Sequence, residues 1–170
     1  TRNKTVLIAM ENHGRENIGD KVDITRTVGW FTSIYPVVFR LKSVDDLSII
    51  IKTVKETLRK IPHRGIGYGV LKYITPKNRL KDISFNLNPE ISFNYLGNID
   101  KAINSDLFEL IDIPTSNAIH YNIKRFFRFE ISGLIFNDIL SISLNYNEKE
   151  YNEITIQNIL NIYKSYLQKI

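Results

Sequence analysis

A short polar segment, residues 11–16 (ENHGRE), directly follows the apolar run of residues 5–10 (TVLIAM). A continuous apolar run of this length is typical of a strand buried on both faces, and functional side chains often lie where such a strand ends. Glu11 would be partly desolvated there, which raises the pKa of a carboxyl group and makes it a better proton-transfer group near neutral pH. The alternative is a structural carboxylate that caps the turn or pairs with Arg15. Glu11 is therefore the first candidate for acid–base chemistry.

His13 and Arg15 belong to the same polar segment, and their roles are less specific. His13 could face a ligand, but an imidazole that shapes the turn through hydrogen bonds is the favoured interpretation. Arg15 could orient Glu11 or hold negative charge, and an ion pair with Glu16 or Asp20 explains it equally well.

A second candidate region is formed by residues 91–95 (ISFNY), which alternate like a strand. The phenol of Tyr95 could donate a proton or stabilise a developing oxyanion, although a core aromatic on a strand is a strong rival interpretation. Asn94 precedes it, and adjacent strand residues point to opposite faces unless a bulge intervenes. We therefore expect one of these two side chains to contact a substrate and the other to support the strand.

Two further segments favour structural interpretations. Trp30 and Phe31 are expected to pack and so to position their part of the molecule, although an aromatic near a channel can also line it. Residues 63–74 contain three glycines without the G-x-G-x-x-G spacing, and they follow Pro62 rather than a strand. They indicate a loop with a tight turn that leads into a short helix, not a dinucleotide site.

Composition excludes several kinds of chemistry. The chain of 170 residues has no cysteine, so disulfides, a thiol nucleophile and Cys-ligated metals are excluded. The three histidines, His13, His63 and His120, do not stand at a metal-binding spacing. Because no run approaches the ~20 apolar residues of a membrane helix and no signal-peptide pattern is present, a metal-free cytoplasmic protein is expected. The net charge of +5 comes from scattered Lys and Arg mixed with acidic residues, which favours an acidic protein partner over nucleic acid.

Four stretches have the composition and alternation of strands. Pro36 argues that its strand lies at a sheet edge or contains a bulge. Asn137-Asp138 separates two alternating runs, which predicts an antiparallel hairpin. Together with the initial apolar run, the expected strands cover residues 33–41, 91–95, 127–132 and 140–146.

Two long helices complete the expected fold. Residues 43–61 carry seven apolar residues at helical spacing, and Pro62 forbids continuation. Ser43 followed by Asp46 resembles a capping box at the start of this helix. A second amphipathic helix is expected at about residues 151–170. The predicted fold class is therefore α/β, with a mixed sheet covered by two long helices.

Four segments, in order along the chain, carry signature motifs: residues 11–16 (ENHGRE), 26–36 (RTVGWFTSIYP), 62–69 (PHRGIGYG) and 93–97 (FNYLG). They resemble the EGHGRE, RTVGWFTxxYP, PxxGxGYG and FNYLG motifs of the epimerization domains of nonribosomal peptide synthetases. Asn12 stands where that family usually has Gly, and residues 98–100 (NID) depart mildly from its usual continuation.

The resemblance implies a chloramphenicol-acetyltransferase-like fold, in which two similar lobes enclose a catalytic channel. The family's first half carries an HHxxxDG motif, and this sequence contains no His-His pair. Residues 1–170 are therefore expected to form the C-terminal lobe of an epimerization domain, without the N-terminal lobe, and so half of an active site.

The resemblance also implies a reaction, the inversion of the α-carbon of an aminoacyl or peptidyl thioester. The substrate would be carried on the phosphopantetheine of a peptidyl carrier domain, with no intrinsic cofactor and no metal. The expected partners are that carrier domain and the missing N-terminal lobe, not nucleic acid or a membrane. A condensation-type lobe that forms peptide bonds, or a non-catalytic lobe that docks a carrier domain, are the alternatives. The implied site residues are Glu11 and Tyr95 as catalytic groups and His13, Arg15, Asn94 and Trp30 as binding or supporting groups.

Overall fold

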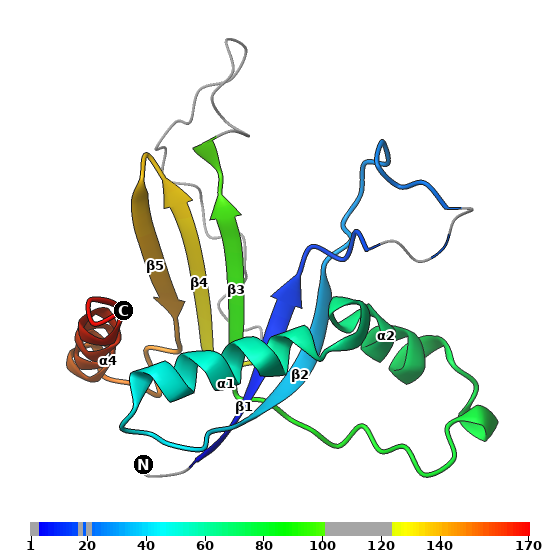
Figure 1. Cartoon of the computed structure of the whole chain (residues 1–170), viewed down its shortest axis with the longest axis horizontal. Helices are drawn as coiled ribbons and strands as arrows, with labels where there is room; N and C mark the ends of the chain where they lie inside the picture. The colour runs from blue at the N-terminus through cyan, green and yellow to red at the C-terminus, as the bar shows by residue number, and fades with distance from the viewer. Residues whose placement is uncertain (1–3, 17–18, 20–21, 101–123) are drawn as a thin grey trace.

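The chain forms a five-stranded mixed sheet with the strand order β2-β1-β3-β4-β5 (Figure 1). The computed structural model describes residues 4–16, 19, 22–100 and 124–170. β1 and β2 are antiparallel, β1, β3 and β4 are parallel, and β4 and β5 form an antiparallel hairpin. The strands are β1 (Thr5–Asn12), β2 (Ser33–Arg40), β3 (Ile91–Asn98), β4 (Phe129–Phe136) and β5 (Ile139–Asn145).

Two long helices accompany the sheet, and the predicted fold class is confirmed. They are α1 (Leu47–Arg59) and α4 (Glu153–Leu167), and between α1 and β3 lie a short helix α2 (Ile66–Gly69), 3₁₀ turns at Pro62–Gly65 and Lys77–Arg79, and a π turn at Val70–Ile74. Among the described helices, none is long and apolar enough to cross a membrane.

The first long helix begins one turn later than the sequence pattern predicted. The side chain of Asp46 caps α1 by accepting a hydrogen bond from the backbone N–H of Ile49 at 3.1 Å. Ser43 instead accepts from the backbone N–H groups of Asp45 and Asp46, both at 3.2 Å. The predicted capping box was therefore wrong, because Ser43 stabilises a turn before the helix and leaves the cap to Asp46.

The core lies between α1 and one face of the β1–β2 pair. Tyr35, Val37 and Phe39 alternate along β2 and are buried. Their β1 partners across the antiparallel pair lie on the same face, since directly opposed strand residues share a face. Packed against them are Ile8 and Met10 of β1, Val54 and Leu58 of α1, Ile61 just after α1, and Tyr68 of α2.

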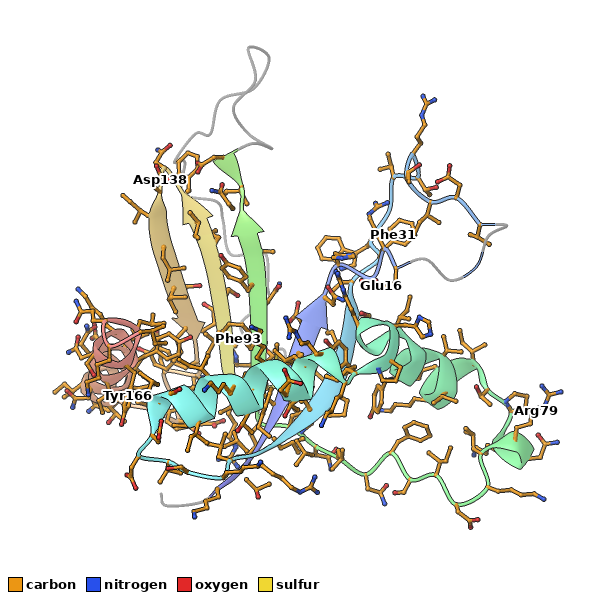
Figure 2. The ribbon with its side chains drawn as sticks, viewed as in Figure 1. Glu16, Phe31, Arg79, Phe93, Asp138 and Tyr166 are labelled. Atoms are coloured by element: carbon orange, nitrogen blue, oxygen red, sulfur yellow. The ribbon has the colours of Figure 1, made fainter. Side chains whose placement is uncertain are left out.

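Both local predictions for the sheet are confirmed. β2, which contains Pro36, is an edge strand, where a missing backbone donor costs least. Asn137 and Asp138 have φ values of 49° and 58°, as a two-residue hairpin turn requires. The β4–β5 hairpin ends at this turn, and Figure 2 shows Asp138 at its tip, far from the polar loop that holds Glu16.

The turn after α1 depends on a glycine. Gly65 has φ of +84°, and a Cβ added there would lie 2.2 Å from the ring of the buried Tyr35. Because Gly65 has no side chain, the backbone at the start of α2 can lie directly against the Tyr35 ring. The segment of residues 62–69 therefore packs beside β2.

The two long helices approach each other at their ends. A shared hollow is lined by Leu47, Ser48, Ile51 and Lys52 of α1 and by Lys169 and Ile170 after α4. At the other end of α4, the ring of Tyr151 packs on Phe129 of β4 at 4.6 Å between centroids. α4 is therefore attached to the sheet through its N-terminal end.

Candidate active site

Glu11 lies at the end of β1 and is held by a residue of the neighbouring strand. The pairing of β1 with β3 joins Ala9 to Ser92 and Met10 to Phe93, so the next residues along both strands are neighbours. The side-chain amide of Asn94 donates a hydrogen bond to Oε2 of the half-buried Glu11 at 3.1 Å. Two of the sequence candidates, 83 positions apart, thus meet where β1 and β3 cease to pair.

The pKa of Glu11 is raised above its ordinary value of 4.5, and the largest cause is burial of the carboxyl group. The negative charge of Glu130 raises the pKa further. Burial disfavours the charged form because the protein solvates a carboxylate less well than water does. A raised pKa brings a carboxyl group closer to the pH at which it transfers protons efficiently.

This raised pKa predicts a pH-dependent effect on stability. A carboxyl group whose pKa is higher in the folded state stabilises the fold below the unfolded-state pKa, and this contribution is lost as the pH rises through the folded-state pKa. Glu11→Gln, which stays neutral, is therefore expected to melt about 1–2 °C above the wild type near pH 8, a small rise because the carboxyl is partly solvated. Toward pH 4 the difference should vanish. Thermal denaturation across this range checks it, and a constant difference at every pH contradicts it.

Asn94 and Glu11 belong to a polar face of the sheet, on the side opposite the core. Ser92 and Asn94 of β3 pair with Glu130 and Ser132 of β4, and these pair in turn with Asn145 and Ser143 of β5. Since residues two apart along a strand share a face, all these side chains lie on one side. We call this set the polar face; it comprises Glu11, Ser92, Asn94, Glu130, Ser132, Ser143 and Asn145.

Tyr95 lies on the other side of the sheet and does not meet Glu11. It pairs with Gly133, and a Cβ added to Gly133 would lie 3.3 Å from the Tyr95 ring and 2.9 Å from Ile142. The irregularity in the β3–β4 pairing begins only after Tyr95, so no bulge brings Asn94 and Tyr95 to one face. The side chain is half exposed, and its proposed role as a catalytic hydroxyl stays a prediction.

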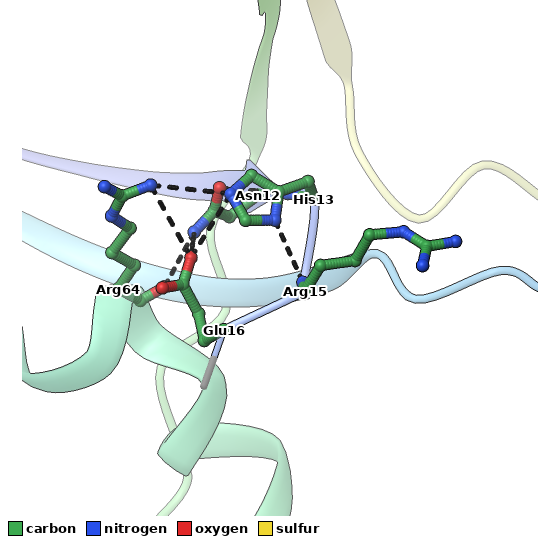
Figure 3. A network of polar contacts seen from close by, with 5 residues as sticks. All are labelled: Asn12, His13, Arg15, Glu16 and Arg64. Carbon is green, nitrogen blue, oxygen red and sulfur yellow. Dashed lines mark hydrogen bonds and ion pairs between the residues drawn. The ribbon is translucent and has the colours of Figure 1, made fainter. Parts of the chain in front are cut away.

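His13 is tied into a polar network at the start of the β1–β2 loop (Figure 3). Its Nδ1 accepts a hydrogen bond from the backbone N–H of Arg15 at 2.9 Å, so in the neutral ring Nε2 carries the proton. Nε2 lies 3.3 Å from Oε1 of Glu16 and 3.4 Å from Nη1 of Arg64. Arg64 approaches the same Glu16 oxygen at 3.7 Å, and Asn12 donates to it at 3.3 Å. These contacts are those of a histidine that shapes the turn.

Arg15 holds the backbone of the loop rather than a carboxylate. Its guanidinium donates to the carbonyl oxygens of Ile24 and Thr27, both at 3.0 Å, and lies 4.2 Å over the ring centroid of Phe31. Among the described residues, no ion pair joins it to Glu11 or Glu16, so both of those expectations were wrong. Asp20, the other expected partner, lies outside the described residues. Arg15 does not pair with Glu11 or Glu16 because the returning half of the loop places the carbonyl oxygens of Ile24 and Thr27 at its guanidinium.

Arg15→Lys is expected to loosen this loop, because an ammonium group cannot reach two carbonyls in the fixed geometry of a guanidinium. We expect amide exchange of Thr27, whose N–H donates to Ile24 at 3.1 Å, to accelerate. The acceleration should be about tenfold, the equivalent of one lost charge-assisted hydrogen bond. Hydrogen-exchange mass spectrometry measures it, with Arg59→Lys on the exposed face of α1 as the matched control. Unchanged exchange at residues 24–28 would contradict the role of Arg15.

Trp30 does not pack as expected. Its side chain is 95% exposed and that of the neighbouring Val28 is 99% exposed in the described part of the chain. Arg15 fixes the loop through the backbone and through Phe31, so the loop needs no contact from Trp30 to keep its shape. Figure 2 shows Phe31 on the loop above Glu16. The packing role expected of Trp30 was therefore wrong, whereas the ring of Phe31 packs against the guanidinium of Arg15.

An open hollow of about 450 Å³ lies at the end of β1 on the α1 side of the sheet, and Glu11 contributes to its lining. Two of its residues, Tyr35 and Arg64, were missed as site candidates by sequence reasoning. The pKa of Tyr35 is raised, first by burial and then by the negative charge of Glu16, while Arg64 opposes the rise. Both residues stand inside the signature motifs, but only the fold brings them to the glutamate. The hollow is lined by Glu11, Asn12, Tyr35, Leu58, Arg59, Ile61 and Arg64.

In the part of the chain that the structure describes, no three His, Asp or Glu side chains are grouped as a metal site would require. His63, at φ of 45°, belongs to the turn before α2. His120 lies outside the described residues.

This chain is similar to known proteins in both sequence and fold. The Condensation domain family matches residues 1–170. The chain belongs to the condensation domain family. Surfactin synthase subunit 1 of Bacillus subtilis (strain 168) is 38% identical over 165 residues, and gramicidin S synthase 1 of Brevibacillus brevis is 42% identical over 173 residues. Each alignment covers 97% of this chain, but only 5% and 16% of the two relatives.

Among solved structures, this condensation-family chain is similar to the epimerization domain from the third module of tyrocidine synthetase B. The TM-score is 0.88 at 38% sequence identity, over 98% of this chain and 37% of the other. The resemblance to epimerization domains is thereby confirmed. The chain spans a little more than a third of that structure.

Proposed function

We propose that this chain is the C-terminal lobe of an epimerization domain in nonribosomal peptide synthesis. Its reaction would convert an L-aminoacyl or peptidyl thioester, tethered to the phosphopantetheine of a carrier domain, to the D-epimer. The proposal is supported by the four motifs and by the similarity to the epimerization domain of tyrocidine synthetase B. The lobe needs no cofactor of its own for this reaction.

The observation that carries the proposal is the contact between Glu11 and Asn94. The thioester acidifies the α-hydrogen, but a base must still remove it. A half-buried carboxylate of raised pKa, oriented by an amide donor at 3.1 Å, has the character of such a base. The α-proton passes to the carboxylate oxygen and the C–H electron pair moves into the enolate. A second acid on the opposite face, which the N-terminal lobe of the complete site would supply, then returns a proton to the α-carbon.

The complete site would include groups from an N-terminal lobe. The end of β1 borders an open hollow on the α1 side of the sheet, and the Glu11 carboxyl on the other side is only half-buried; an opposing lobe that covered this strand end would exclude water from the carboxylate. Tyr95, on the opposite face of β3, has no contact with Glu11 in this lobe, and its hydroxyl would act only on a substrate that reaches both sides of that strand end.

Two alternatives have support of their own. The family that matches the chain is named for condensation, so a lobe that forms peptide bonds is the first. The second is a non-catalytic lobe that docks an acidic carrier domain, and the net charge of +5 would favour that encounter. Neither alternative requires a proton-transfer role for Glu11.

One assay separates the three. In the intact protein that contains this chain, the carrier domain is loaded with an L-aminoacyl group and α-proton exchange is followed in deuterated water. Exchange that depends on Glu11 supports the epimerase. Peptide-bond formation without exchange supports condensation, and carrier binding without either reaction supports the docking lobe.

A further inference from the structure

We propose that Glu130 and Arg125 are positioning residues of the reaction, which act across the polar face by controlling the charge state of Glu11. The inference rests on the proposed function, because it concerns the proton carried by the same carboxyl group.

Strand register places Glu130 on the same side of the sheet as Glu11. Ser92 of β3 pairs with Ala9 on one side and with Glu130 on the other, and Glu11 lies two residues beyond Ala9. All four side chains therefore share a face. The lateral separation between β1 and β4 is two strand spacings, about 10 Å. Glu11 also lies two residues, about 7 Å, further along the strand than the position level with Glu130, so the two Cα atoms are about 12 Å apart. At this distance two carboxylates in partly buried positions still repel each other.

Arg125 is fixed on the far side of Glu130 from Glu11. Its Nη2 lies 2.8 Å from Oε2 of Glu130, and its Nη1 donates to the backbone carbonyl of Tyr146 at 3.1 Å, just after β5. The carboxylate of Glu130 thus stands between a fixed cation and Glu11. Arg125 reduces the negative field that Glu130 exerts on Glu11 but does not remove it, since both members of the pair are partly exposed.

Two further charged groups near Glu11, Arg59 and Arg64, lie on the α1 side of the sheet. Arg59 and Arg64 line the hollow together with Glu11, and Arg64 is already paired with Glu16. On the adjacent strands the residues beside Glu11 are the uncharged Ile34 and Asn94. The charge of Glu130 is the interaction that raises the pKa of Glu11 beyond the effect of burial. Glu130 therefore determines how far the pKa of Glu11 lies above that of a merely buried carboxyl.

Two substitutions should move the pH profile of α-proton exchange in opposite directions. Glu130→Gln removes the repulsion at nearly constant shape, so the apparent pKa assigned to Glu11 should fall by about 0.3–1 unit. Arg125→Met leaves Glu130 uncompensated, so the apparent pKa should rise by a smaller amount. The rate at the plateau should change less than threefold in both variants. The measurement is kcat/KM for exchange against pH in the intact protein. Glu148→Gln, which removes an exposed carboxylate between β5 and α4, is the control.

The outcomes separate this inference from the proposed function. Shifts of opposite sign support it. A profile that is lowered equally at every pH, or that moves the same way in both variants, overturns it and leaves Glu130 as a structural residue. If Glu130→Gln does not fold, the test depends on Arg125→Met alone. A rise in its apparent pKa then supports the inference, and an unchanged or lowered value overturns it. Exchange that persists in Glu11→Gln overturns the proposed function, and titration of the Glu11 carboxyl carbon by ¹³C NMR in this chain then tests the coupling without any reaction.

Discussion

Replacing Glu11 by Gln is expected to slow α-proton exchange by about 10²–10⁴-fold, the usual contribution of a positioned general base. Gln has the shape of Glu, and its carbonyl oxygen can still accept the hydrogen bond that Asn94 donates to Glu11 at 3.1 Å. What it lacks is the ability to take up a proton. Because the neutral amide also relieves the burial of a charge, the variant should fold at least as well as the wild type near neutral pH. Loss of activity with retained stability distinguishes a functional carboxylate from a structural one.

The experiment requires the intact protein, a carrier domain loaded with an L-aminoacyl group, and deuterated solvent. Mass spectrometry of the released amino acid gives exchange, and chiral chromatography gives the fraction of the D-epimer. Glu148→Gln is the matched control, since this carboxylate is exposed in the turn between β5 and α4. Exchange in Glu11→Gln within threefold of the wild type would remove Glu11 from the mechanism.

The second large effect is expected on stability, from Gly14→Ala. Gly14 follows His13 in the polar segment and has φ of +66°. A Cβ added there would lie 1.6 Å from the backbone carbonyl oxygen of Phe31, on the returning half of the β1–β2 loop. A backbone atom cannot move aside as a side chain can, so the loop must shift as a whole. We expect a loss of about 3 kcal/mol, which combines left-handed strain with overpacking.

For a chain of this size such a loss lowers the melting temperature by about 6–12 °C. Gly67→Ala is the matched control, because Gly67 lies in α2 and a Cβ there meets nothing within 4 Å. That variant should melt at or slightly above the wild-type temperature, since alanine reduces the entropy of the unfolded chain. Differential scanning calorimetry of the three proteins measures both changes. A Gly14→Ala variant that melts within 2 °C of the wild type would mean that the loop adapts freely.

The larger elements could be predicted from local sequence. The apolar run of residues 5–10, the alternating runs around Asn137-Asp138 and the helical spacing of residues 43–61 correspond to β1, the β4–β5 hairpin and α1. Each is a pattern within a single stretch of chain, and backbone geometry alone links it to a strand or a helix. The error at the start of α1 is of the same local kind. Ser43 and Asp46 are both good capping residues, and their order alone does not say which one is used.

The composition of the candidate site depended on contacts between distant stretches. Asn94 meets Glu11 because β3 pairs with β1, and the same pairing turns Tyr95 to the opposite face. No pattern within residues 91–95 contains the strand order, so the sequence could state only that one of the two would face the site. Glu130 could not be selected at all, because its position relative to Glu11 follows from the pairing of β3 with both β1 and β4.

The long loop between β1 and β2 was the part of the site that the sequence predicted least well. The alternatives for Arg15 were carboxylates close to it in sequence, yet its guanidinium donates to two backbone carbonyls that side-chain types do not reveal. Trp30 was expected to pack because it is large and apolar, but the fixed loop leaves it exposed. The sequence by itself thus determined the strands, the helices and the family motifs, since these are local. The tertiary structure decided which motif residues meet, because strand order and loop closure join positions that no local pattern relates.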